Sequence, residues 1–111
     1  MHEMALVRGI IDICQQHAAG RQVLALEVEI GELGGVVAEA LEFCFEACSK
    51  ETVLEGARLS LIQIAGTGLC QECGALTPIN ALFSPCGSCG SYQVVVQSGE
   101  ELRVRSIEVE D

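Results

Sequence analysis

The chain has 111 residues, of which half are apolar, 16 are acidic and 6 are basic, so its formal net charge is -10. A negative surface repels phosphate backbones, and no apolar run approaches the ~18 residues of a membrane span, so we expect neither nucleic acid nor a membrane as a partner. At this length we expect one ordinary domain, or one domain with a small metal-stabilised insert.

The N-terminus reads Met1-His2-Glu3 and shows no basic stretch followed by an apolar core. A secretory signal is therefore not expected, and the expected location is cytoplasmic. The chain also has seven cysteines. In a reducing compartment such cysteines are more often metal ligands or small buried hydrophobic residues than disulfide partners, and their spacing decides between these roles.

The first half of the chain predicts a helix over residues 6–17, a strand over 24–30 and, after a glycine-rich loop, a second helix from residue 37. The strand shows the alternation of apolar and polar residues that is typical of a half-buried sheet. Both helices carry apolar residues at spacings of three or four. The positions that we expect to be buried are Leu6, Ile10, Ile13 and Cys14 on the first helix and Val37, Leu41, Cys44 and Cys48 on the second.

The second half predicts a strand over residues 58–64, a cysteine-rich insert over 66–99 and a last strand over 102–109. The insert differs from its surroundings because it holds four cysteines, both prolines and no Lys or Arg. The last strand must return to the first unit, since its apolar side chains would otherwise be exposed. Its alternation changes phase near Arg105 and Ser106, which indicates a β-bulge.

Two Cys-x-x-Cys pairs lie in the insert, Cys70 with Cys73 and Cys86 with Cys89, and a glycine follows each pair. A short turn of this kind lets both sulfurs of a pair face one ion. Four thiolates in a tetrahedron suit Zn²⁺ and leave no open position for catalysis, so we predict a structural zinc site. Buried or redox-active cysteines and two disulfides are the alternatives, but a thioredoxin-like enzyme needs only one pair at the start of a helix, and no amphipathic helix follows either pair.

The insert has Glu72 as its one charged residue, so a protein partner fits it better than DNA. Candidate contacts are Ile79, Leu82, Phe83 and Tyr92. For Ile79 and Leu82, a role in covering the zinc is an equal alternative.

The N-terminal triplet offers a second set of ligands. The amine of Met1, the amide and imidazole of His2 and the amide of Glu3 could surround one ion with nitrogens. Such a site suits Ni²⁺ or Cu²⁺, whereas a thiolate cage suits zinc. Taken alone, a histidine at position two is usually only a solvated terminus.

The opening residues 1–6, the two cysteine pairs, the segment 31–33 and the closing residues 106–110 together resemble the HypA/HybF family of hydrogenase maturation factors. The resemblance covers the whole chain. It implies a carrier and not an enzyme, which binds nickel and delivers it to the [NiFe]-hydrogenase large-subunit precursor with the help of a GTPase partner. In some organisms the family also supports urease, which adds urease accessory proteins to the implied partners.

The resemblance implies a residue set for each metal, and the sequence departs from neither motif. Transferable Ni²⁺ is assigned to His2, with the Met1 amine and the Glu3 backbone, and structural Zn²⁺ is assigned to the four cysteines of the insert. Cys14, Cys44 and Cys48 have no implied role, and burial is the expected one. His17, near a helix C-terminus, is expected to interact with the helix dipole.

These features predict an α+β fold in which two helices pack on a three-stranded mixed sheet, with an inserted zinc-ribbon domain. The expected domains are a nickel-binding α/β domain over residues 1–65 plus 100–111 and a zinc-binding domain over 66–99. Two other functions remain open: a zinc-ribbon protein-interaction adaptor without nickel transfer, which would bind zinc only, and a thiol oxidoreductase, whose activity the zinc cage would suppress.

Overall fold

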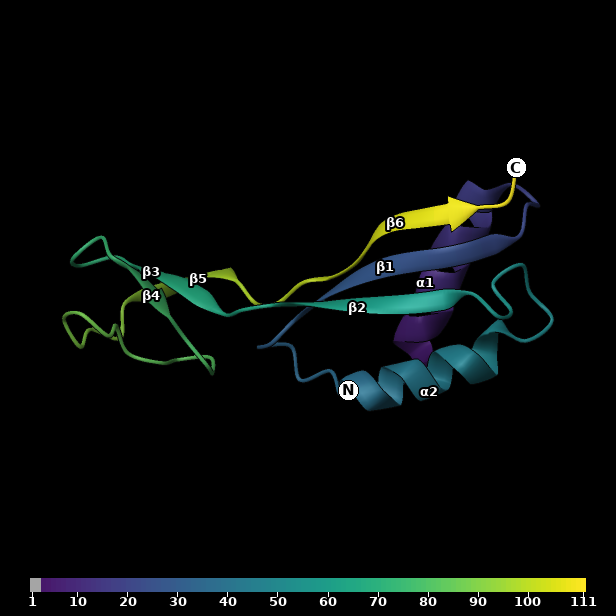
Figure 1. The fold of residues 1–111 in the computed structure, drawn as a ribbon. Coiled ribbons are helices and arrows are strands. Elements are labelled where there is room, and N and C mark those ends of the chain that lie inside the picture. Colours follow the sequence, from purple (N-terminus) through teal and green to yellow (C-terminus); the bar gives the residue numbers. More distant parts are fainter. Residues whose placement is uncertain (1–2) are drawn as a thin grey trace. The chain divides into compact units, whose positions relative to one another are not determined.

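The computed structural model describes residues 3–111, which form two compact units, each with its own β-sheet (Figure 1). We call them the helix–sheet unit and the ribbon unit. The helix–sheet unit comprises residues 3–29, 36–62 and 103–111, and the ribbon unit comprises residues 30–35 and 63–102.

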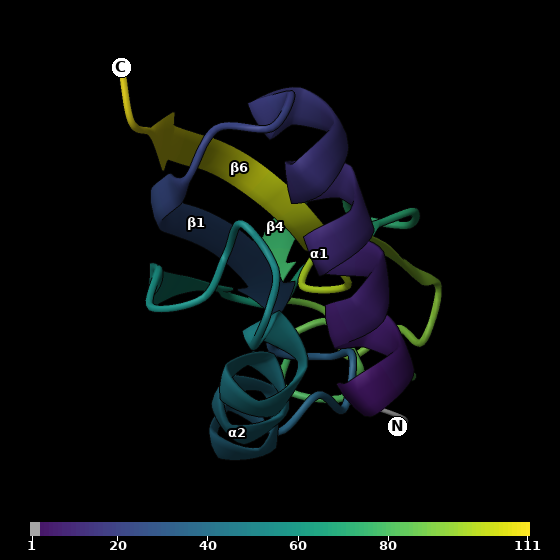
Figure 2. The same ribbon diagram turned by 90° about the vertical axis from the view of Figure 1, so that its right-hand side faces the viewer.

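Two helices form one layer of the helix–sheet unit. Helix α1 (Glu3–Ala18) packs against α2 (Ala38–Ser49), and both lie on one side of the three strands β1, β2 and β6 (Figure 2). The predicted packing of two helices on a sheet is therefore confirmed. Among the described residues, no helix is long and apolar enough to cross a bilayer.

The sheet of this unit has the strand order β2-β1-β6 and consists of β1 (Val23–Gly31), β2 (Arg58–Ile64) and β6 (Leu102–Val109). Strand β2 follows β1 through the crossover helix α2, and the two strands run in the same direction in Figure 1. Strand β6 runs the opposite way, because Arg103 pairs with Glu29 and Glu110 N donates to Gln22 O. The sheet is mixed, as predicted, and the last strand does return to the first one.

The alternation of β6 slips by one residue at the predicted place. Gly31 N donates to Glu101 O near one end of the β1–β6 pair and Glu110 N donates to Gln22 O at the other, so both ends share one register and the slip is seen in the exposure of the β6 side chains. The β-bulge itself stays a prediction. Arg105, which lies at the slip, and Ser106 are consecutive exposed residues.

The helical core differs from the predicted one on both helices. Ile11 is buried on α1, whereas Ile13 is 47% exposed. On α2 the buried aromatic residue is Phe45, and Val37 is 57% exposed. Apolar residues adjoin each predicted stripe, so the spacing alone did not fix its rotation. The half-buried Cys44 and Cys48 therefore correct the expectation that both are buried, whereas Cys14 is buried as expected.

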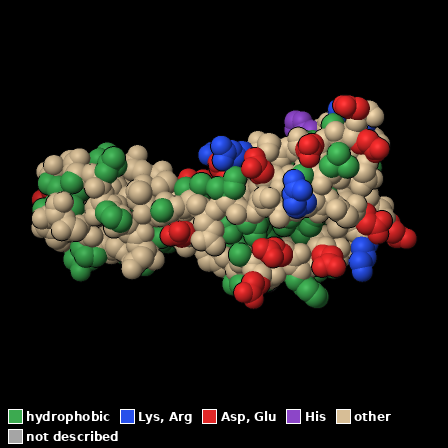
Figure 3. Space-filling view, in the orientation of Figure 1, with side chains coloured by type: hydrophobic (Ala, Val, Ile, Leu, Met, Phe, Trp, Pro, Cys, Tyr) green, Lys and Arg blue, Asp and Glu red, His purple; other side chains and the backbone are tan. Residues whose placement is uncertain are grey.

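The ribbon unit contains a second, antiparallel sheet in the order β4-β3-β5, made of β3 (Thr67–Cys70), β4 (Leu76–Pro78) and β5 (Val94–Ser98). These short strands were not predicted individually. The face drawn in Figure 3 shows charged side chains over the helix–sheet unit, whereas the ribbon unit shows mainly hydrophobic and uncharged surface. Large exposed apolar residues here are Leu76, Leu82, Phe83, Tyr92 and Val95.

Candidate metal centre

The first cysteine pair lies at the end of β3, where the backbone folds into a tight turn. Cys70 N donates to Ala75 O at 2.9 Å, and Gly74 N donates back to Cys70 O at 3.0 Å. Gly74 has a φ of +76°, a conformation that costs glycine little but strains residues with a Cβ. The turn places Cys73 beside Cys70, so that both sulfurs lie on the same side.

The second pair repeats this turn. Cys86 N donates to Ser91 O at 2.8 Å, Gly90 N donates to Cys86 O at 2.9 Å, and Gly90 also has a φ of +76°. The two knuckles therefore share one backbone geometry, which explains why the sequence repeats the pattern Cys-x-x-Cys-Gly. No described helix follows either pair.

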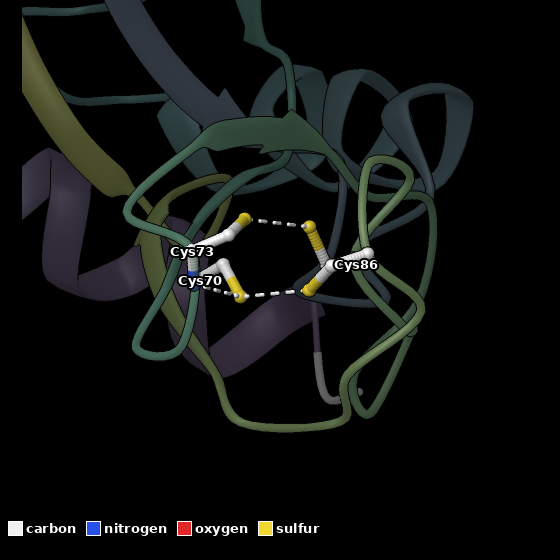
Figure 4. A group of neighbouring side chains, drawn as sticks. Cys70, Cys73 and Cys86 are labelled. Atoms are coloured by element: carbon white, nitrogen blue, oxygen red, sulfur yellow. Dashed lines mark hydrogen bonds between the residues drawn. The ribbon is translucent and has the colours of Figure 1, made fainter.

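The two knuckles bring their four sulfurs together, and Figure 4 shows the side chains of the labelled cysteines converging. The sulfurs of Cys70 and Cys89 are 3.6 Å apart, and those of Cys73 and Cys86 are 3.7 Å apart. All four lie within 4.8 Å of one another. Zn–S bonds of about 2.3 Å in a tetrahedron would separate the sulfurs by roughly 3.8 Å, so the donor set fits zinc in both chemistry and size.

Backbone amides favour the thiolate form of one cysteine in each knuckle. The amides of Cys89 and Ser88 donate to Cys86 Sγ and lower the pKa of that thiol to about 6. The amide of Cys73, and less strongly that of Glu72, lowers the pKa of Cys70. Because the thiolate is the form that binds a metal, these amides prepare both knuckles for an ion.

The pKa values of the remaining two thiols, those of Cys73 and Cys89, are both raised. The Ser91 amide lowers the pKa of Cys89, but the crowded sulfur of Cys70 and burial outweigh this effect and raise the pKa to about 12. Negative charges this close repel one another, so four thiolates cannot coexist without a positive ion between them. A divalent cation would supply that charge.

Thr77 is a supporting residue that the cysteine spacing could not reveal. It is 3% exposed, lies on β4 and accepts a hydrogen bond from Gly87 N at 3.1 Å. This bond ties the second knuckle to the sheet that carries the first. A buried hydroxyl needs a hydrogen-bond partner, but the sequence around Thr77 does not indicate that Gly87 is that partner.

The other candidate ligands lie outside this cluster. Met1 and His2, which the nickel prediction needs, are outside the described residues. Cys14, His17, Cys44 and Cys48 belong to the helix–sheet unit. Within residues 3–111, the four cysteines of the ribbon unit form the one group of three or more Cys, His, Asp or Glu side chains close enough to hold a metal ion.

Glu3 is the one member of the predicted nickel site that the structure describes. Its carboxylate accepts a hydrogen bond from Val37 N at 3.4 Å, at the start of α2. Val37 provides no side-chain cap for α2, so Glu3 supplies an anion to that helix N-terminus. The next residue, Met4, contacts Cys48 on α2 through its sulfur. The first turn of α1 is therefore held against α2.

Comparisons with known proteins agree with this architecture. Residues 1–109 match the family model described as "Hydrogenase/urease nickel incorporation, metallochaperone, hypA". The hydrogenase maturation factor HypA of Geobacter metallireducens is 52% identical over 110 residues, which are 99% of this chain and 100% of that protein. HypA 2 of Bradyrhizobium diazoefficiens is 45% identical over 113 residues, with 99% and 100% coverage.

A solved structure agrees as well. The solution structure of the Ni metallochaperone HypA from Helicobacter pylori has a TM-score of 0.72 at 28% identity, and the match covers 98% of this chain and 97% of that one. The family match spans both units, including the N-terminal triplet and the four cysteines. The chain therefore belongs to the HypA family of hydrogenase and urease nickel-incorporation metallochaperones.

Proposed function

We propose that this chain binds nickel at Met1, His2 and Glu3 and delivers it to the [NiFe]-hydrogenase large-subunit precursor, together with a GTPase partner. The family match over residues 1–109 carries this proposal, because it includes the terminal triplet as well as the cysteine cluster. The protein acts in the cytoplasm as a carrier without enzymatic turnover. Urease accessory proteins are a second set of partners.

Zinc has a structural role in this proposal and is held by the four cysteines. Four thiolate ligands saturate a tetrahedral ion, so no position remains for a substrate. The ribbon unit buries few apolar side chains. Ile79 is buried, as are the ligands Cys70 and Cys86. A segment this small depends on the free energy of metal binding for its fold.

Nickel is the cargo, and its proposed donors are nitrogens: the Met1 amine, the His2 amide and imidazole and the Glu3 amide. Glu3 opens α1, and the amide of a first-turn residue has no carbonyl acceptor within its own helix. That nitrogen can therefore coordinate a metal without breaking the helix. The contact of the Glu3 carboxylate with Val37 N anchors this end of the site.

Different ligand types keep the two metals apart. Nitrogen donors in a tetragonal arrangement suit Ni²⁺, whereas a tetrahedral set of thiolates suits Zn²⁺. Ligands at a chain terminus can be replaced one at a time, but four sulfurs on two hydrogen-bonded turns must leave together. Exchange therefore takes place at the terminus, and the cage retains its ion.

The two histidines of the chain allow a matched experiment. Zinc-loaded wild type, His2→Ala and His17→Ala are titrated with Ni²⁺ by calorimetry, and their zinc contents are measured. We expect His2→Ala to abolish tight nickel binding without loss of zinc, and His17→Ala to bind nickel like wild type. Affinity should fall as pH drops, since protons compete for the amine, amides and imidazole.

One further variant and one transfer assay complete the test. A single extra residue before Met1 should weaken nickel binding nearly as much as His2→Ala, because it displaces the free amine. Nickel-loaded protein should also transfer its ion to a separately purified large-subunit precursor. Unchanged nickel affinity in His2→Ala would refute the site, and a wild type that binds zinc but no nickel would favour the zinc-ribbon adaptor instead.

A further inference from the structure

A pocket of about 490 Å³ lies in the helix–sheet unit, and none of its lining residues belongs to a proposed metal site. One wall is the C-terminal half of α1 with the residues after it, which contribute Ile13, Cys14, His17 and Arg21. The other wall is β6, through residues 104–107 and Val109. The proposed nickel function uses none of these residues.

The β6 wall is the open edge of a sheet. Strand β6 is the last in the order β2-β1-β6, so one side of its backbone has no neighbouring strand in that sheet. Four consecutive residues of β6 line the pocket. Alternate side chains of a strand point to opposite faces, so consecutive residues share a pocket only where it runs along the strand's edge. Such an edge can pair with another extended chain.

The pocket is cationic although the chain is acidic. Arg21 and Arg105, two of the chain's six basic residues, line it together with His17, and none of its lining residues is acidic. The Nε of Arg21 donates to Ala18 O at 3.2 Å, which fixes the guanidinium and leaves the rest of its donor fork for a ligand. Arg105 lies where the burial alternation of β6 changes phase, and it lines the pocket.

Apolar side chains complete the pocket. Ile13 is 47% exposed there, and Val104, Ile107 and Val109 are half-buried. Basic and apolar side chains thus line one pocket beside an open strand edge. A phosphate would engage only the cations, and a nucleic acid would meet a chain of net charge -10. An extended peptide can use the backbone edge, the cations and the apolar surface at once.

We propose that this groove binds an extended segment of a partner protein, with alternating acidic and apolar residues, as an added strand on β6. Its backbone pairs with the β6 edge, its carboxylates meet Arg21 and Arg105, and its apolar side chains cover Ile13 and Ile107. Backbone pairing supplies affinity, and the charge pattern supplies selectivity.

The test uses the full-length zinc-loaded protein and a fluorescent hexapeptide of alternating valine and glutamate as the probe. Anisotropy gives the dissociation constant, and amide NMR shifts locate the site. We expect the largest shifts at residues 104–109, and no binding of a valine–lysine peptide. Peptides N-methylated at one or the other set of alternate amides distinguish backbone pairing, because only the set that faces β6 should abolish binding.

Matched charge variants test the cations. Arg21→Gln/Arg105→Gln should weaken peptide binding roughly ten-fold, at about three-fold for each exposed charge pair. Lys50→Gln, which removes a charge outside the pocket, should change it less than two-fold. Both variants must retain zinc and a folded NMR spectrum. The proposal would be overturned if the lysine peptide bound equally well, or if both N-methylated peptides bound like the unmethylated one. Binding of inorganic phosphate to this pocket without binding of the peptide would also overturn it.

Discussion

The helix–sheet unit and the ribbon unit differ in what stabilises them. The first unit buries whole aliphatic side chains, and Leu26, Leu41 and Leu54 are at most 1% exposed. In the second, two of the few buried side chains, Cys70 and Cys86, belong to the proposed zinc cage. The hydrophobic effect stabilises the first unit, and we propose that a zinc ion crosslinks the second, so they should respond to different perturbations.

Loss of zinc should have the largest effect. Structural zinc sites of this type contribute ~10–16 kcal/mol near neutral pH, which is folding energy for the segment that they close. Cys73→Ser should therefore unfold residues 66–99 and leave most of the helix–sheet unit folded. Hydrogen exchange of the variant, with zinc analysis, measures both effects. Amides that stayed protected in the insert would contradict a metal-dependent fold.

Removal of β6 should reverse this pattern. A chain ending at Gly99 keeps all four cysteines but loses the strand that pairs with β1, and it exposes apolar surface that β6 covers. We expect the fragment to bind zinc and to lose the cooperative unfolding transition of the helix–sheet unit. Calorimetry and circular dichroism provide the measurement. A 1–99 fragment that unfolded cooperatively like the whole chain would show that β6 is dispensable.

A single core truncation should act on the helix–sheet unit alone. Leu41→Ala removes a fully buried side chain and should cost about 2–5 kcal/mol in the free energy of unfolding. Phe43→Ala, two residues along the same helix, is the control: Phe43 is 73% exposed, so its loss should cost about 0.5 kcal/mol or less. Denaturant unfolding gives both values, while zinc affinity should stay unchanged. Similar losses from the two variants would disprove the described rotation of α2.

The smallest effect is expected at Thr77. Thr77→Val keeps the side-chain shape but removes the acceptor for Gly87 N, at a cost of about 1 kcal/mol. Thr77→Ser keeps the hydroxyl and should restore most of the loss. Competition with a chromogenic chelator would report this as about five-fold weaker zinc binding in the valine variant. No difference between the two variants would exclude a role for this hydrogen bond.

Sequence patterns predicted the parts of the fold that depend on local rules. The paired knuckles follow from a repeated turn with glycine in the same place, and the return of β6 follows from the need to cover its apolar residues. The change of phase in the exposure of β6 at Arg105 could be predicted because alternation along a strand has a fixed period of two.

Other features depend on tertiary packing and could not be read in this way. Ile11 and Ile13 are equally apolar, so only the position of the neighbouring elements decides which one is buried. The same holds for Cys44 and Phe45 on α2. Thr77 acquires its role from a residue ten positions away, and the three short strands of the ribbon unit have too few residues for a clear period.

We propose that nickel and zinc occupy different ligand sets in one chain. X-ray absorption at both metal edges of the same sample, loaded with one equivalent of each ion, tests it directly. We expect four sulfurs at about 2.3 Å around zinc and only nitrogen or oxygen neighbours around nickel. Sulfur in the first coordination shell of nickel, or fewer than four sulfurs around zinc, would contradict it.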